Sequence, residues 1–139
     1  MARGRKRAQA CGGDQARQRL AHAKSFLDVA ELTADVDDPS LEYGSVAASV
    51  AILAGIAAAD AACCQVLGRR SRSDDHHHAE ALLLEITPGG KRAAGQLRKL
   101  ITLKDAAHYG FVSMSTPQLK QSIRQARQLV EFAENALLR

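Results

Sequence analysis

Apolar residues recur at helical spacing in the first part of the chain. Steps of three and four between them predict an amphipathic helix from about Asp14 to Thr33, for which Asp14 is a suitable N-cap. The apolar stripe consists of Leu20, Ala23, Leu27, Ala30 and Ala34. The next segment, ADVDDPSLEYG, interrupts the pattern with acidic residues, a proline and a glycine, which are typical of a connection.

The segment from Ser45 to Gly68 is almost wholly apolar, and Asp60 is the only formally charged residue in it. A helix that is apolar nearly all round is a buried helix, and Ser45 can cap it. Steps of four and three connect Val46, Val50, Leu53, Ala57, Asp60, Cys64 and Leu67. Asp60 is therefore predicted to face other helices, where a carboxylate requires a cation or hydrogen-bond donors.

The rest of the chain predicts three more helices, the last of which begins with Thr116 as its cap and Pro117 in its first turn. They cover about 74–88, 91–108 and 116–138. Five helices with short connections predict an all-α, up-and-down bundle. We expect residues 13–139 to form this single domain.

The first twelve residues carry a basic cluster and no apolar periodicity. Lys+Arg 19 and Asp+Glu 15 give a net charge of +4. The cluster alone supplies four positive charges, from Arg3, Arg5, Lys6 and Arg7. We expect residues 1–12 to be a disordered arm that folding does not need; alternatively, such an arm can hold nucleic-acid phosphates.

The composition favours close packing of helices over a β-sandwich, because 46% of the residues are hydrophobic but only 4% are aromatic. A membrane span is disfavoured, since a central Asp60 adds roughly 2.5–3.5 kcal/mol to insertion. The N-terminus lacks a signal-peptide pattern, so we expect a soluble, cytoplasmic protein. Cys11, Cys63 and Cys64 are expected to be reduced, with no disulfide framework.

Asp60 is the best candidate for a functional site. Lys104 and His108 lie four residues apart on one side of the predicted fourth helix, with Tyr109 next to them. If that side packs on the central helix, Asp60 could pair with Lys104, His108 or the hydroxyl of Tyr109. The group would form a polar pocket that binds an anion; alternatively, it is a satisfied polar cluster that fixes helix register.

Two further polar clusters follow the central helix. Arg69, Arg70 and Arg72 form a basic turn that could bind phosphate in a fork geometry; alternatively, they are solvated and favour the C-terminus of the central helix. A run of three histidines follows, because the chain reads His76-His77-His78. Adjacent helix residues diverge by about 100°, so this run does not converge on one ion. We expect no metal and no cofactor.

The end of the predicted fourth helix, which reads LKDAAHYG, resembles the HEPN superfamily of helical domains found beside nucleotidyltransferases and in toxin–antitoxin systems. Ribonuclease members carry an Arg, usually a polar residue after it, then three residues and a His. In this chain His108 matches the His, Lys104 takes the polar position, and Leu103 stands where the Arg belongs. The resemblance implies a helical bundle without the catalytic arginine.

Three functions follow from these patterns. The leading one is a non-catalytic HEPN-like domain that binds a protein partner, or a nucleotide or RNA, as a homodimer. By resemblance, the partner would be a nucleotidyltransferase or an antitoxin. The alternative is a metal-independent ribonuclease in which His108 is the general acid or base and Lys104 steadies the phosphate. The third is a purely structural or dimerisation module.

Overall fold

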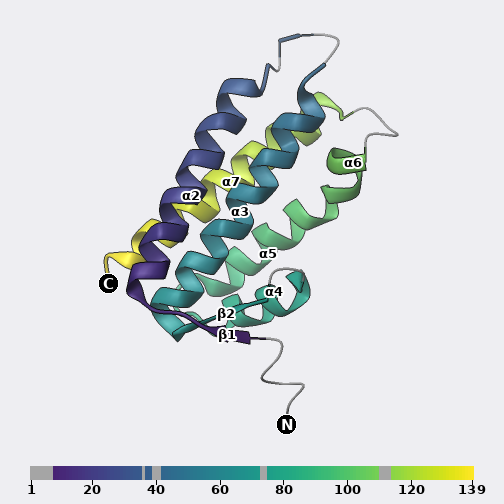
Figure 1. The fold of residues 1–139 in the computed structure, drawn as a ribbon. Coiled ribbons are helices and arrows are strands. Elements are labelled where there is room, and N and C mark those ends of the chain that lie inside the picture. Colours follow the sequence, from purple (N-terminus) through teal and green to yellow (C-terminus); the bar gives the residue numbers. More distant parts are fainter. Residues whose placement is uncertain (1–7, 36, 39–41, 73–74, 110–113) are drawn as a thin grey trace.

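Two long helices, α2 (Gly13–Thr33) and α3 (Gly44–Leu67), form the centre of this computed structural model, with α7 (Thr116–Leu137) packed against both. The structure describes residues 8–139 except 36, 39–41, 73–74 and 110–113. Figure 1 shows α2 and α3 running antiparallel, with α7 behind them and the shorter helices on the other side of α3.

The shorter elements pack along much of the length of α3. They are β2 (Arg69–Ser71), α4 (His76–Leu84), α5 (Gly90–Thr102) and α6 (Lys104–Tyr109). A strand near the N-terminus, β1 (Ala8–Ala10), pairs antiparallel with β2, so that Ala8 lies opposite Ser71 and Ala10 opposite Arg69. The described residues thus contain six helices and two three-residue strands, and the predicted all-α bundle is confirmed.

Small side chains allow α3 to sit at the centre of the bundle. Most alanines between Ala47 and Ala62 are fully buried, so neighbouring helices approach the α3 backbone closely. At Gly55 an added Cβ would lie 3.1 Å from Cδ1 of Leu129 and would overlap Leu100, which brings α5 and α7 against α3 at this point. By length and composition α3 could cross a membrane, but 72% of its most apolar window is buried inside the bundle.

The predicted stripe along α3 is confirmed in its second half and wrong in its first. Ala57, Asp60 and Cys64 are buried, whereas Val46 is 53% exposed and Leu53 is 41% exposed. The alanine-rich sides of α3 face its neighbouring helices, α2 and α7 above all. Larger apolar residues in the first half therefore remain at the surface.

The predicted fourth helix is wrong at its centre, because it divides into α5 and α6 at Leu103. The backbone N–H of Leu103 donates to the carbonyl of Leu100 at 3.0 Å, a tight turn that ends α5. The next helix starts at once, since Ala107 N donates to the carbonyl of Leu103 at 3.0 Å. Lys104 and His108 therefore belong to a short helix of their own.

Helix caps differ from the predicted ones at all three starts for which a cap was predicted. Ser115 caps α7 in place of Thr116, in a reciprocal pair with Gln118 at 3.2 and 2.9 Å. Gly12 precedes α2, so that Asp14 lies in the first turn, and Tyr43 precedes α3 without a side-chain cap. Asp75 caps α4, for which no cap was predicted, and its carboxylate accepts from the N–H of His78 at 2.9 Å.

The predicted disordered arm is wrong for residues 8–12, which belong to the fold. They contain β1, and Cys11 N donates to the carbonyl of Gly68 at 3.0 Å. Cys11 also forms a disulfide with Cys64, with an S–S distance of 2.09 Å, so the prediction of three reduced cysteines is wrong for this pair. Cys63 is free and buried. The basic cluster of Arg3, Arg5, Lys6 and Arg7 lies outside the described residues.

Candidate functional site

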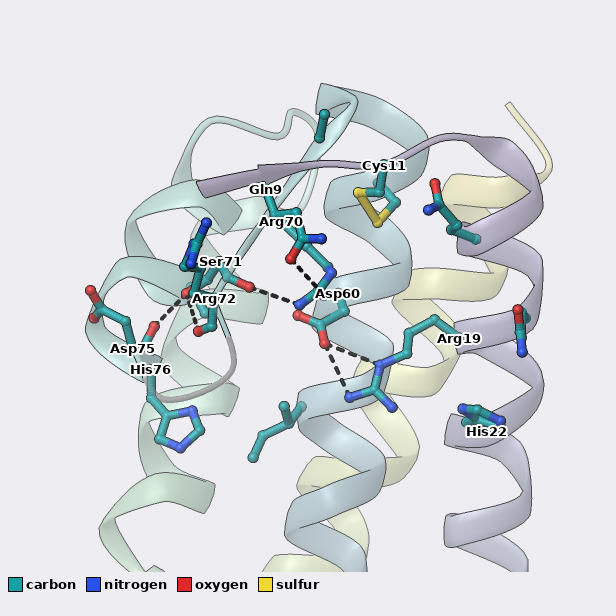
Figure 2. A pocket seen from close by; sticks show the side chains of 16 residues that line it. Gln9, Cys11, Arg19, His22, Asp60, Arg70, Ser71, Arg72, Asp75 and His76 are labelled. Carbon is teal, nitrogen blue, oxygen red and sulfur yellow. Dashed lines mark hydrogen bonds and ion pairs between the residues drawn. A yellow bond between two sulfur atoms is a disulfide. The ribbon is translucent and has the colours of Figure 1, made fainter. Parts of the chain in front are cut away.

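A cavity of about 380 Å³ opens beside the C-terminal half of α3. Its walls come from the start of α2, the start of α4 and the β1–β2 pair, and its floor comes from α3 (Figure 2). Its lining combines charged and imidazole side chains with amides and small apolar residues. We call it the arginine pocket and define it by Arg19, His22, Asp60, Arg70, Arg72 and His76, together with the amides of Gln9, Gln15 and Gln18.

Asp60 and Arg19 form the ion pair at the floor of the pocket. Nε of Arg19 donates to Oδ2 of Asp60 at 3.1 Å, and Nη2 of the same guanidinium lies 3.1 Å from the same oxygen. Asp60 is 8% exposed, so the prediction that it is shielded is confirmed. Burial raises the pKa of Asp60 above its ordinary value, although Arg19 and, more weakly, Arg70 lower it.

Arg70 is held over the pocket by two hydrogen bonds. Its Nη2 donates to Oε1 of Gln9 at 3.0 Å, and its Nη1 donates to the carbonyl of Ser71 at 3.1 Å. Figure 2 shows this guanidinium between β1 and Asp60. Arg72, one residue beyond β2, is exposed and also lines the cavity. These two arginines of the predicted basic cluster therefore do share one site.

Arg69 does not belong to that site. It donates through Nη2 to both carboxylate oxygens of Glu85, at 2.8 and 2.9 Å, on the far side of β2. Successive residues of a strand point in opposite directions, so Arg69 and Arg70 separate as soon as the predicted turn becomes a strand. The sequence interpretation as a turn concealed this division.

Two histidines flank the ion pair. His22 lies one turn beyond Arg19 on α2, and His76 is the first residue of α4 (Figure 2). Nε2 of His76 lies 3.3 Å from Nζ of Lys104, so α6 touches the rim of the pocket through this contact. Among the residues that the structure describes, no three His, Cys, Asp or Glu side chains gather closely enough to hold a metal ion.

The predicted group of Asp60, Lys104 and His108 is not assembled. Asp60 pairs with Arg19 of α2, Lys104 contacts His76, and Nδ1 of His108 lies 2.7 Å from Oγ of Ser49. Ser49 precedes Asp60 by 60 − 49 = 11 residues, or about 16 Å along the helix axis. Because α6 packs on the first half of α3, His108 lies far from the carboxylate. The side chain of Tyr109 lies outside the described parts of the structure.

Sequence reasoning missed Arg19 and His22, although the helical hairpin contains a signal for both. Asp60 lies 60 − 44 = 16 residues into α3, and Arg19 lies 33 − 19 = 14 residues before the end of α2. In two antiparallel helices with a short connection, positions at similar distances from the connection lie opposite each other. That count points from Asp60 to Arg19 rather than to the fourth helix.

The charge balance of the arginine pocket favours an anion. Arg19, Arg70 and Arg72 supply three positive charges, and Asp60 and Asp75 supply two negative ones, which leaves 3 − 2 = +1 before any histidine is protonated. A comparison of the chain with protein-family models and with curated proteins found no match in either. The site therefore has to be interpreted from its own chemistry.

Proposed function

We propose that this chain is a non-catalytic, HEPN-like helical domain that binds a small phosphorylated ligand of the nucleotide class in the arginine pocket. The single observation that carries the proposal is the convergence of Arg19, Arg70 and Arg72 on one cavity of about 380 Å³. Guanidinium groups match phosphate oxygens in a bidentate geometry, and cavities of this size hold small ligands.

The division of chemistry inside the pocket supports a nucleotide rather than a free anion. Arg70 and Arg72 lie toward β2, where a phosphate group would meet both. Gln15 and Gln18 line the opposite wall on α2, and their amides offer donors and acceptors that suit the edge of a base. Ile56 and Ala79 supply apolar surface between the two walls. We infer that the phosphate faces β2 and the base faces α2.

Binding without cleavage is the function that the HEPN-like motif itself favours. Leu103, the residue at the expected arginine position, forms the break between α5 and α6 and brings no charge. His108 contacts Ser49, outside the lining of the arginine pocket. Phosphoryl chemistry depends on positive charge placed around the phosphate, so the pocket and the motif histidine do not act on one phosphate.

The partners and the location inferred from the sequence stay part of the proposal. The protein partner would be a second copy of the chain, a nucleotidyltransferase or an antitoxin. RNA would bind through one of its nucleotides in the same pocket. A cytoplasmic location also stays a prediction. The Cys11–Cys64 disulfide limits this prediction. Disulfides of cytoplasmic proteins are usually transient and redox-sensing, so in that location we expect the bond to form and break.

The test is calorimetric titration of the full chain with adenosine monophosphate and with inorganic phosphate. We expect saturable binding of the nucleotide, and a loss of at least about tenfold in Arg70→Ala and in Arg72→Ala, since each removes one charge-assisted contact. Arg92→Ala, on the exposed side of α5, is the matched control and should bind as the wild type does. Equal affinity in all four proteins would overturn the proposal.

A further inference from the structure

The Cys11–Cys64 disulfide joins the cover of the arginine pocket to its floor. Cys11 follows β1, which crosses over the cavity in Figure 2, and Cys64 lies one helical turn after Asp60 on α3. Both cysteines line the pocket. They are separated by 53 positions in sequence, so the bond is the covalent link between β1 and the helix that carries the ion pair.

Few other contacts hold β1 in place. Its pairing with β2 spans three residues on each side, and Cys11 N adds one bond to the carbonyl of Gly68 at 3.0 Å. Among the hydrogen bonds of the described residues, β1 has one more, from Arg70 to Gln9 at 3.0 Å. An isolated pair of strands is marginally stable at best in water, so we infer that the disulfide contributes much of the order of β1, which pairs with β2 alone.

We propose that the Cys11–Cys64 disulfide is a redox switch for ligand binding: the oxidised chain binds, and reduction by a dithiol releases β1 and weakens binding. This inference rests on the proposed function. Arg70 transmits the change, because it donates one of its two hydrogen bonds to Oε1 of Gln9 in β1. When β1 leaves, Arg70 loses the contact that orients its guanidinium over Asp60.

The chemical step is ordinary thiol–disulfide exchange. A thiolate of the dithiol attacks Sγ of Cys11, the more exposed residue of the pair, and the S–S bond breaks with Cys64 as the leaving thiolate. The second thiol of the reductant then attacks the mixed disulfide and releases Cys11. Two electrons pass to the protein, both its thiolates take up protons, and the dithiol becomes a disulfide.

The third cysteine does not interfere with this exchange. Cys63 is 2% exposed, and burial, with Asp60 adding to the effect, raises the pKa of its thiol to about 12. Only the thiolate attacks disulfides, so Cys63 stays inert although it adjoins Cys64 in the chain. The switch therefore has two states, and Cys63→Ala is a control that leaves both of them intact.

The experiment measures adenosine monophosphate binding by the full chain before and after treatment with dithiothreitol, beside Cys11→Ser, Cys63→Ala and circular dichroism of each form. We expect the oxidised wild type and Cys63→Ala to bind alike. The reduced wild type and Cys11→Ser should bind about tenfold more weakly, because one positioned contact is lost. Helical content should be equal in all forms, since the bundle core does not include β1.

Hydrogen exchange at residues 8–12 separates failure of the switch from failure of the proposed function. Protection there should fall on reduction, whatever ligand the pocket takes. If the oxidised chain binds no nucleotide, the proposed function fails, and the loss of protection alone still supports redox release of β1. If oxidised and reduced chains bind equally, or if protection at residues 8–12 does not change, the switch is overturned.

Discussion

The guanidinium of Arg19 and the carboxylate of Asp60 meet in the floor of the arginine pocket, with two nitrogens of the arginine 3.1 Å from one oxygen, Oδ2. The arginine side chain is 34% exposed and the aspartate side chain 11% exposed. Asp60 is thus the more desolvated partner, and burial outweighs the arginine in setting the direction of its pKa.

Asp60→Asn should bind adenosine monophosphate about three- to tenfold more tightly than the wild type, because it removes the negative charge nearest to the pocket arginines. Calorimetric titration at neutral pH measures the change. Glu131→Gln, on the exposed side of α7, removes the same charge at a distance and should leave the affinity unchanged. Weaker binding by Asp60→Asn would contradict this prediction and mean that the carboxylate is needed to position Arg19 for the ligand.

The stability of the wild type should depend on pH through Asp60. Its folded-state pKa is raised above the ordinary value of 3.8, so the folded chain binds this proton more tightly than the unfolded chain does. The free energy of unfolding should therefore fall as pH rises from 3.8 through the folded-state pKa, and stay flat above it. Urea unfolding across this range, with Asp60→Asn as the reference, measures the effect; parallel curves for the two proteins would contradict it.

Deletion of residues 1–12 should lower the free energy of unfolding by about 2–4 kcal/mol, because it removes the Cys11–Cys64 cross-link. The expectation that this segment is dispensable applies at most to residues 1–7. Deletion of residues 1–7 alone keeps β1 and both cysteines, and serves as the matched control in thermal and urea unfolding. Equal stability of the two deletions under oxidising conditions would show that the cross-link contributes nothing.

Gly90→Ala should destabilise the bundle by about 2–4 kcal/mol. A Cβ at Gly90 would overlap the backbone carbonyl oxygen of Leu83, which cannot turn away as a side chain could. Gly95→Ala, in the same helix, has no atom within 4 Å of the added Cβ and should stabilise by about 0.5–1 kcal/mol. Urea midpoints of the two variants should move in opposite directions, and a shift of the same sign would refute the packing at Gly90.

The full chain should show no cleavage of single-stranded RNA above background in chelator. Nδ1 of His108 lies 2.7 Å from Ser49, and Leu103 supplies no charge at the expected arginine position. His108→Ala is the control for contaminating nucleases. Reproducible cleavage by the wild type that this variant lacks would promote the alternative function, a metal-independent ribonuclease.

The helical pattern of the chain determined more of the fold than of the site. Helices α2, α3 and α7 begin and end within a residue or two of the predicted limits, because apolar periodicity and capping residues are local properties. Burial of Asp60 also followed from the sequence, since its helical spacing with Ala57 and Cys64 placed it on a face that packs against other helices.

Only the tertiary structure decided what Asp60 meets. Its partner depends on which helix lies opposite and in which register, and the sequence pointed to Lys104 or His108 rather than to Arg19. Because the helix breaks at Leu103, Lys104 contacts His76 and His108 contacts Ser49. The antiparallel packing of α2 and α3 places Arg19 beside Asp60. The Cys11–Cys64 disulfide was likewise decided by the tertiary structure. A contact between residues 53 positions apart depends on how the helices pack, and no local sequence pattern indicates it.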